Sequence, residues 1–508
     1  MIQQKKCYKE LYNFLSSSFE SHTDLEIDLW NQVDGEEIPE LSSGLAKCTN
    51  LSSLNLNISN CLIGDEFASN LAIALKKCPM LSKVKLYLSE NDISEEGILA
   101  FTSTIETYAN LTDLTLSFES NKIGDKGAQF LSSALAKITC LTSLTLDLSQ
   151  GQIDVQGVTD LGSALSKCIN LSNLSLNLKR NWFSDEGILG LTSSFASIQN
   201  LSNLTLDISN NCISDQGALN LGSSLATYMN LQSLVLDASV NEIQDEGVSA
   251  LGISLANCKK ISNLSLGLHS NKFGSQGISG LGSAFKNSTT LSKLTIDLQA
   301  NQIGDEGAST LGQALEKCFN LSDLTLTLCG NLIGDEGLSR LSSSLGNCIN
   351  LSHLTLNLSN NQFGDQGISS IASNFKNCTK LSSLTLDISQ IEITTQSFQD
   401  LIFALPSWAN ISNLSLNLSC NFIDEQSALD LGISLSNCLN LQNLELDLNY
   451  NSINLNGALD LASGLAKCAK LSTLKLRIGE TSIPYEELFN ISTKILKQKN
   501  LVVMMLVL

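Results

Sequence analysis

The sequence predicts an α/β solenoid, a stack of strand–helix repeats with a parallel sheet along one face and helices along the other. A thirty-residue period holds without slippage from Leu51 to Leu501. Within each period, apolar residues first alternate at strand spacing and then recur at helix spacing. The chain is 43% hydrophobic and only 16% charged, with four prolines, as one continuous folded array requires. A fixed period predicts repeats that bury their apolar faces against their neighbours.

The first part of each repeat predicts a strand. In the repeat that begins at Leu291, the residues Leu294, Ile296 and Leu298 alternate with polar ones. Alternation at period two places these three in the core and their polar neighbours in solvent. We therefore expect the strands of successive repeats to lie side by side in a parallel sheet.

In most repeats an asparagine follows the predicted strand. The positions are Asn31, Asn91, Asn121, Asn181, Asn211, Asn241, Asn271, Asn301, Asn331, Asn361, Asn421 and Asn451. A turn inside a stack leaves backbone groups that water cannot reach, and an amide both donates and accepts hydrogen bonds. These residues are predicted to be structural, and a row of ligand-binding amides is the alternative.

The segment IGDEG comes next and predicts the start of a helix. Asp305 can cap a helix, and Glu306 favours its positive end. The recurring carboxylates suggest calcium as an alternative, but they lack the alternating oxygen ligands of a calcium loop. Leu311, Leu315 and Cys318 then share one helix face.

Nine of the fifteen cysteines occupy one position late in the predicted helix. They are Cys48, Cys78, Cys168, Cys258, Cys318, Cys348, Cys378, Cys438 and Cys468. Other repeats place Ile138 or Tyr108 there, so the position is apolar and buried. Neighbouring helices lie about 8–10 Å apart, too far for a disulfide between equivalent positions. Reduced thiols indicate a cytoplasmic protein.

The repeat pattern LxxLxLxLxxNxI resembles the leucine-rich-repeat superfamily and, within it, the ribonuclease-inhibitor-like class. The resemblance implies a right-handed horseshoe with the sheet on the concave face and helices on the convex face. We expect a capping helix at residues 1–20, and at residues 21–508 an array of sixteen thirty-residue repeats plus a final strand. Two residues are inserted before the Asn relative to the common family pattern, which lengthens the strand by about 6–7 Å.

Three places break the pattern. Gly151 and Ile391 stand where other repeats have Asn. The chain ends in the apolar strand Leu501–Leu508, an edge with no helix after it. An uncovered apolar edge is a liability, so either a partner covers it or the sequence is one piece of a longer protein.

Charge and motifs argue against several functions. Carboxylates outnumber Lys and Arg by 50 to 30, which disfavours nucleic acid or an anionic membrane as a partner and permits a basic protein. The N-terminus lacks the apolar run of a signal peptide. His22, His269 and His353 lie in distant repeats, and no nucleotide, kinase or metalloprotease motif is present. We expect no enzyme, cofactor or metal.

The concave face remains as the candidate binding site, because solenoids usually bind there. Its outward strand positions carry the predicted partner-binding residues Asp147, Asn177, Asp207, Asp237, Asp297, Asp387 and Asp447. Asp207 and Asp237 should lie about 5 Å apart on adjacent strands, which is unfavourable unless a cation intervenes. This predicts a non-enzymatic scaffold for a basic protein or peptide. A solvated polar face is the alternative.

Two further hypotheses remain open. Some proteins with this fold activate small GTPases, and that resemblance makes Arg180, beside Trp182 at a strand exit, the candidate residue for such a role. The chain could instead be the recognition segment of a larger signalling protein, joined through the C-terminal strand.

Overall fold

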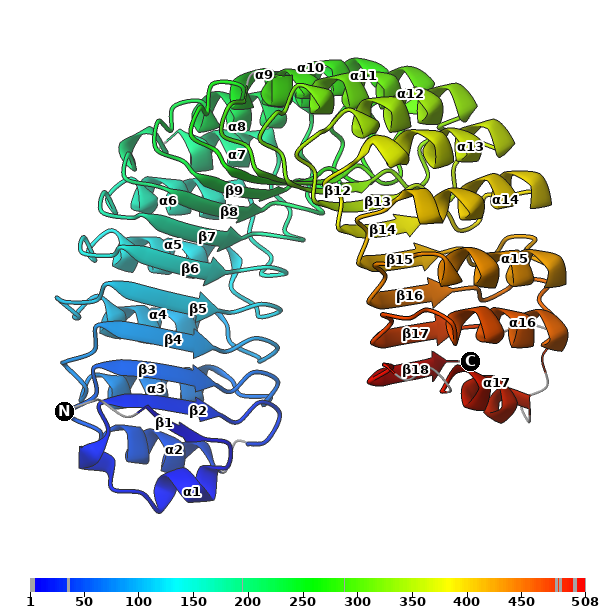
Figure 1. Cartoon of the computed structure of the whole chain (residues 1–508). Helices are drawn as coiled ribbons and strands as arrows, with labels where there is room; N and C mark the ends of the chain where they lie inside the picture. Colours follow the sequence, from blue (N-terminus) through cyan, green and yellow to red (C-terminus); the bar gives the residue numbers. More distant parts are fainter. Residues whose placement is uncertain are drawn as a thin grey trace. The chain divides into compact units, whose positions relative to one another are not determined.

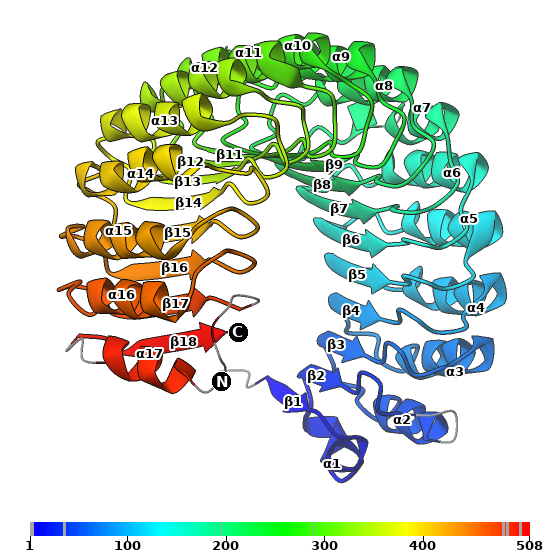
Figure 2. The same cartoon turned by 90° about the vertical axis from the view of Figure 1, so that its right-hand side faces the viewer.

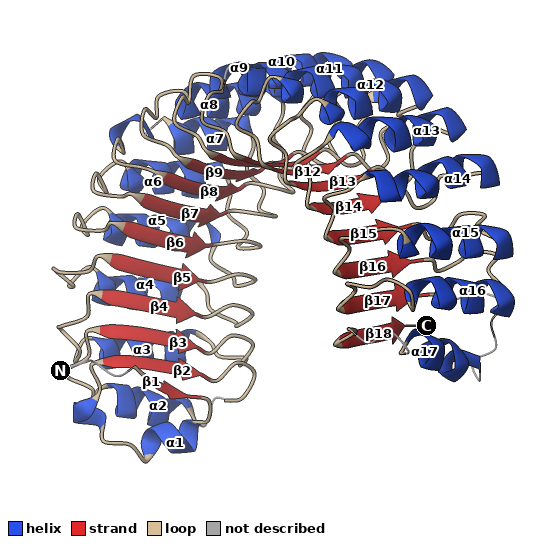
Figure 3. Cartoon of the chain, in the orientation of Figure 1, coloured by secondary structure: helices blue, strands red, loops and turns tan. Residues whose placement is uncertain are grey.

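The structure is a computed structural model. It describes residues 5–33, 37–193, 195–286, 288–479, 483, 487–496 and 500–507. The chain divides into two compact parts, Met1–Ile243 and Gln244–Leu508, here named the N-terminal half and the C-terminal half. In each half the strands line one face and the helices line the other (Figures 1 and 3).

The N-terminal half alternates strands and helices. Its strands are β1 (Lys6–Tyr8), β2 (Asp24–Asp28), β3 (Ser53–Asn57), β4 (Lys83–Tyr87), β5 (Asp113–Ser117), β6 (Ser143–Asp147), β7 (Asn173–Asn177), β8 (Asn203–Asp207) and β9 (Ser233–Asp237). Its α-helices are α1 (Leu11–Leu15), α2 (Ile38–Leu45), α3 (Asp65–Leu75), α4 (Glu95–Ile105), α5 (Gly124–Leu135), α6 (Val155–Leu165), α7 (Asp185–Thr192) and α8 (Asp215–Leu225). Short 3-10 turns lie at Phe19–Ser21 (η1) and Phe195–Ser197 (η2).

The C-terminal half has the same alternation (Figure 2). Its strands are β10 (Asn263–Gly267), β11 (Lys293–Asp297), β12 (Asp323–Thr327), β13 (His353–Asn357), β14 (Ser383–Asp387), β15 (Asn413–Asn417), β16 (Asn443–Asp447), β17 (Thr473–Arg477) and β18 (Val503–Val507). Its α-helices are α9 (Asp245–Leu255), α10 (Ser275–Lys286), α11 (Gly304–Glu316), α12 (Asp335–Gly346), α13 (Asp365–Asn374), α14 (Thr395–Ala404), α15 (Glu425–Ser436), α16 (Leu455–Leu465) and α17 (Leu488–Ile495). The 3-10 turns η3 (Phe375–Asn377) and η4 (Leu405–Ser407) extend α13 and α14.

Neighbouring strands within each half pair in parallel with matched repeat positions. Leu294 faces Leu264 and Leu324, and Ile296 faces Leu266 and Leu326. These inward leucines and isoleucines are buried and pack beneath the helices. The predicted parallel sheet and the strand–helix order are therefore confirmed within each half.

The N-terminal segment differs from the expected capping helix at residues 1–20. Helix α1 has only five residues, and strand β1 precedes it. Strand β1 pairs in parallel with β2 and so covers its edge. The helix contributes Phe14, which is fully buried and packs edge-on against Tyr8 and Phe19 with ring centroids 5.7 and 5.3 Å away. A strand pairs with the backbone of β2 at Leu25–Ile27, which a helix could not do.

Most of the predicted asparagines form a buried ladder. Asn91 is 5% exposed, and its Oδ1 accepts hydrogen bonds from the backbone N–H groups of Cys61 and Ile63 at 3.1 and 3.2 Å. Its Nδ2 donates to the carbonyls of Ile58, Leu88 and Ser89. Asn181 and Asn421 repeat this pattern. The amides join each turn to the turn of the preceding repeat.

The prediction that Asn31 belongs to this ladder is wrong, because Asn31 is exposed and lies outside it. Strand β2 pairs with β3 at an offset of 29 residues, so Asn31 corresponds to Asn60. Both residues adopt a left-handed backbone, with φ of 54° and 56°. Asn31 accepts a hydrogen bond from Asn60 Nδ2 at 3.2 Å. The short first repeat thus moves its asparagine into the turn, a conformation that Asn tolerates well.

The predicted aspartate caps act on a different helix from the one expected. Asp335 is the first residue of α12, but its Oδ1 accepts hydrogen bonds from Gly364 and Gly367, at the start of α13, at 2.8 and 2.7 Å. Asp65 and Asp245 cap the following helices in the same way. Each carboxylate therefore satisfies unpaired N–H groups of the next helix and helps to hold two repeats together.

The cysteine column packs as apolar side chains. Eight of its nine members are buried, Cys438 is half-buried, and none of the described cysteines forms a disulfide. Cys318 Sγ lies 3.4 Å from the carbonyl oxygen of Phe285 in the preceding repeat. Burial raises the pKa of Cys318 to about 12 and that of Cys78 to about 11. The thiols are protonated at neutral pH and unreactive.

Strand β18 spans Val503–Val507 within the predicted strand Leu501–Leu508, and it pairs with β17 in the register Leu474–Met504 and Leu476–Leu506. Val503 and Met505 are each 53% exposed on the outward side. Leu508, the last residue of the predicted strand, lies outside the described residues. Among the described helices, none has both the length and the apolar character needed to cross a bilayer.

Candidate functional site on the sheet face

The solvent side of the strands in each half is here named the sheet face. Each strand from β2 to β17 presents three side chains there, at its first, middle and last positions. In β8 these are Asn203, Thr205 and Asp207, while Leu204 and Leu206 between them are buried. The middle positions of β5 to β8 and of β11 to β15 carry only Ser or Thr. The sheet face therefore has a floor of small hydroxyl groups bordered by amides and carboxylates.

The last position of the strand, where most predicted site residues lie, has a structural role that was not predicted from the sequence. Asp207 Oδ1 accepts hydrogen bonds from the backbone N–H and the hydroxyl of Ser209, at 2.9 and 2.7 Å. Asp147 and Asp387 bind the serine two residues onward in the same way. The same backbone contact occurs at Asn177, Asp237, Asp297 and Asp447. One oxygen of each side chain thus closes the turn that follows its strand.

The second carboxylate oxygen is the one directed to a neighbour, and at several strands that neighbour is an Asn that donates a hydrogen bond to it or an Arg that pairs with it. Asn177 Nδ2 donates to Asp147 Oδ2 at 3.0 Å, and Asn417 Nδ2 donates to Asp387 Oδ2 at 2.9 Å. Asp447 Oδ2 lies 3.5 Å from Arg477 Nη1. These carboxylates have partners one repeat away within the protein.

Asp207 and Asp237 are different, because they face each other across β8 and β9. Among the described strands, this is the one place where two acids are neighbours at the last position. Burial raises the pKa of Asp207 and the Asp237 carboxylate raises it further, while the hydrogen bonds from Ser209 lower it. Lys179 lowers this pKa as well, but no ion pair joins it to Asp207 within the described residues. Like charges about 5 Å apart favour a bound cation.

The other predicted residues lie at separate places. Asp297 has the uncharged neighbours Gly267 on β10 and Thr327 on β12. Arg180 and Trp182 lie beyond the end of β7, where Arg180 Nη1 donates to Gln150 Oε1 at 3.4 Å. Trp182 is 66% exposed at this rim.

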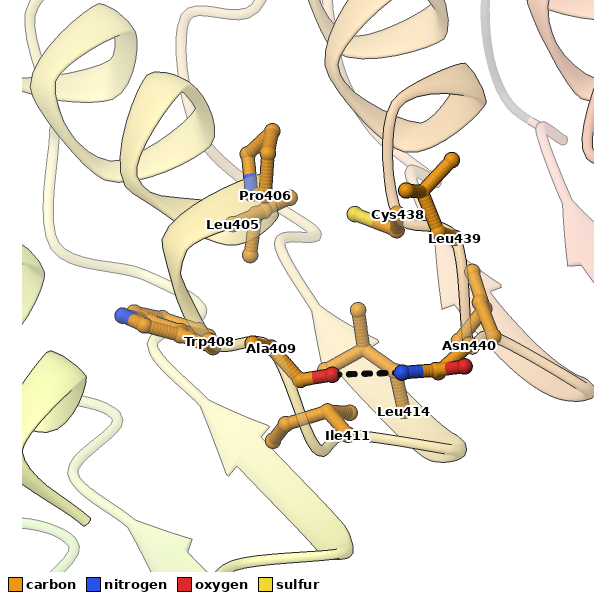
Figure 4. Close-up of a pocket in the computed structure, with 10 residues that line it drawn as sticks. Leu405, Pro406, Trp408, Ala409, Ile411, Leu414, Cys438, Leu439 and Asn440 are labelled. Atoms are coloured by element: carbon orange, nitrogen blue, oxygen red, sulfur yellow. Dashed lines mark hydrogen bonds between the residues drawn. The ribbon is translucent and has the colours of Figure 1, made fainter. Parts of the chain in front are cut away.

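Two of the hollows in the described structure lie in the C-terminal half. A hollow of about 260 Å³ lies on the sheet face of the C-terminal half, over the small side chains Thr385 and Ser415 and beside Glu445 and Lys475. A cavity of about 20 Å³ lies where η4 meets the segment after α15, and Figure 4 shows Leu405, Ile411 and Leu414 around it. This second cavity is large enough for about one water molecule. The cavity is a small packing gap between two successive repeats.

The described residues contain no group of three or more His, Cys, Asp or Glu side chains placed to hold a metal ion.

The sequence contains a signal for the contacts between the last strand residue and the turn that follows it. The spacing Asp-x-Ser recurs at Asp147, Asp207, Asp237 and Asp387. Asp side chains commonly bond to the backbone two residues onward.

The comparisons with known proteins agree with this architecture. The family model described as Leucine Rich repeat matches residues 110–132, 200–222, 290–312 and 350–372. No curated protein compared with the chain matches it. With its stacked strand–helix repeats and its asparagine ladder, the chain is a leucine-rich-repeat protein. Such repeats form scaffolds for protein interaction, and the fold is typical of binding proteins without enzymatic activity. The ribonuclease-inhibitor-like class stays a prediction.

Proposed function

We propose that the chain is a non-enzymatic scaffold that binds a basic segment of a protein partner on its sheet face. The supporting observation is the Asp207–Asp237 pair. Each carboxylate gives one oxygen to its own turn, and within the described residues the structure shows no hydrogen bond or ion pair from an Asn or Arg of a neighbouring strand to the pair, as Asp147, Asp387 and Asp447 have. A Lys or Arg side chain of the partner would relieve this repulsion.

The test compares two charge-reversal variants of the full chain. Asp207→Lys/Asp237→Lys removes the acidic pair, while Asp147→Lys/Asp387→Lys makes the same change in net charge at carboxylates that already have Asn partners. Proteins captured from cell extract by each bait are quantified by mass spectrometry. The proposal is supported if the proteins captured by wild type are lost with the first variant and retained with the second. Capture of the same partners by wild type and the first variant contradicts it.

The buried, reduced cysteine column supports a cytoplasmic location within this proposal, because thiols persist in reducing compartments. The exposed outward side of β18 supports a second contact at Leu501–Leu508, which would join the scaffold to other domains or chains.

A GTPase-activating role is the second candidate, and the exposure of Trp182 beside Arg180 favours it. Arg180 lies at a rim where a bound protein could reach it. Hydrolysis measured on a panel of small GTPases tests this role. Acceleration by wild type that is lost in Arg180→Ala would replace the scaffold proposal.

A further inference from the structure

The sheet face of the N-terminal half also carries a basic strand. Lys83 and Lys85 occupy the first and middle positions of β4, and both are exposed. No ion pair joins either of them to a carboxylate within the described residues. Because the chain has a net charge of -20, a strand with two lysines departs from its overall composition.

Other cations on the sheet face have acidic partners. Lys475 Nζ and Arg477 Nη1 each lie 2.8 Å from Glu445 Oε1, and Lys293 Nζ lies 3.8 Å from Asp323 Oδ2. These contacts join neighbouring strands, as the Asn–Asp contacts do. The lysines of β4 depart from that pattern.

The strands beside β4 place one carboxylate, that of Asp113, opposite its lysines, and no ion pair joins it to them within the described residues. Lys85 faces Asn55 on β3 and Thr115 on β5, and neither carries a charge. Lys83 faces Asp113 on β5. The Asp113 carboxylate instead accepts the hydroxyl of Thr112 at 2.6 Å. Tyr87, half-buried at the last position of β4, adds an aromatic surface beside the lysines.

The distance from the lysines of β4 to the Asp207–Asp237 pair determines how long a bound segment must be to contact both. Four strand steps separate β4 from β8, and at about 4.8 Å per step they span about 19 Å. The middle positions between them hold Thr115, Thr145 and Ser175, which leave a low, uncharged path. An extended chain advances about 3.3 Å per residue, so about six residues cover this span.

We propose that the N-terminal half binds an extended segment of a protein partner with charges of both signs. An acidic residue of the segment pairs with Lys83 and Lys85, and a basic residue about six positions away pairs with Asp207 and Asp237. The basic contact rests on the proposed function, and the acidic contact is additional to it. The lysines of β4 and the Asp207–Asp237 pair then determine the direction in which the segment binds and the spacing between its acidic and basic residues.

The probes are fluorescein-labelled peptides measured by fluorescence anisotropy with the full chain at low salt. The bipolar peptide has two Glu and two Arg separated by five Ser or Gly residues. A basic peptide replaces the Glu residues with Ser, and a short peptide reduces the spacer to one residue. We expect the bipolar peptide to bind about threefold to tenfold more tightly than either control, the range that two exposed ion pairs give.

Variants of the full chain assign the contacts. Lys83→Glu/Lys85→Glu should remove the advantage of the bipolar peptide and leave binding of the basic peptide undiminished. The matched control Lys122→Glu/Lys137→Glu changes the net charge equally at lysines paired with Asp92 and Glu106, and it should keep the advantage. Circular dichroism verifies that each variant is folded.

The outcomes separate the two proposals. Equal binding of bipolar and basic peptides, both dependent on Asp207 and Asp237, overturns the acidic contact and keeps the proposed function. Binding that persists in Asp207→Asn/Asp237→Asn overturns the proposed function. A single-stranded oligonucleotide that binds more tightly than the bipolar peptide and depends on Lys83 and Lys85 assigns β4 to nucleic acid and overturns the inference.

Discussion

Removal of one ladder asparagine should destabilise the protein strongly and locally. Asn91 makes five hydrogen bonds, two from buried N–H groups and three to carbonyls. In Asn91→Ala the N–H groups of Cys61 and Ile63 lose their acceptor in a place that water does not reach. Each unsatisfied buried group costs about 1–3 kcal/mol, so we expect the free energy of unfolding to fall by about 3–5 kcal/mol.

Urea denaturation followed by circular dichroism measures the loss, and hydrogen exchange at Cys61 and Ile63 locates it. Asn110→Ala is the matched control, because Asn110 is exposed, and its effect should stay within about 0.5 kcal/mol. Asn91→Asp keeps an acceptor for the two N–H groups but places an oxygen against three carbonyls, so it too should destabilise. Equal urea midpoints for Asn91→Ala and Asn110→Ala would refute the structural role of the ladder.

Four further predictions concern single features. Val240 has φ of 55°, which β-branched residues avoid, so Val240→Asn should stabilise by about 1 kcal/mol in thermal unfolding, and Asn210→Val, at the same φ, should do the reverse. Asp335→Ala should cost about 1 kcal/mol and speed hydrogen exchange at Gly367, whereas Glu336→Ala, which removes an exposed pair with Arg340, should not. Cys318 should resist iodoacetamide at pH 8, while the exposed Cys7 and Cys212 react. The folded Cys318 thiol keeps its proton to a pH near 12, whereas the unfolded thiol ionises near pH 8.5. The free energy of unfolding should therefore fall as the pH rises above about 8.5. Asp207→Asn should raise stability by about 0.2–1 kcal/mol at pH 7 but not at pH 3, where the raised pKa leaves the carboxyl protonated, and Asp147→Asn should give no gain.

The sequence predicted the parts of the fold that follow from one repeat. Alternation identified the inward strand residues, and the chemistry of an amide identified the ladder. Contacts between repeats were harder to predict, because their register depends on the stack. The aspartate of the IGDEG segment was expected to cap the helix that it begins, whereas Asp335, at this position, caps the next helix. Asn31 was assigned to the ladder, but the short first repeat moves it by one residue.

The candidate site was predicted with less detail for the same reason. The outward acids were identified from alternation, but the sequence did not reveal that one oxygen of each closes a turn. It also did not reveal which acids receive a hydrogen bond from the next strand. Asp147 and Asp387 have Asn partners thirty residues onward, while Asp207 has an acid. Those relations appear once the register of the strands is fixed.

The regular stack gives a physical criterion for separating structure from function. In a repeat array, a structural polar side chain finds its partner about one repeat away, as Asn91, Asp335 and Glu445 do. A charged side chain whose neighbouring repeats offer no partner adds repulsion or exposed charge and no stability. Asp207 and Asp237, which face each other, and Lys85 of β4, which faces Asn55 and Thr115, meet this description on the sheet face of one half. A ligand that supplies the missing charges would complete at those two places the pairing that the repeats complete elsewhere.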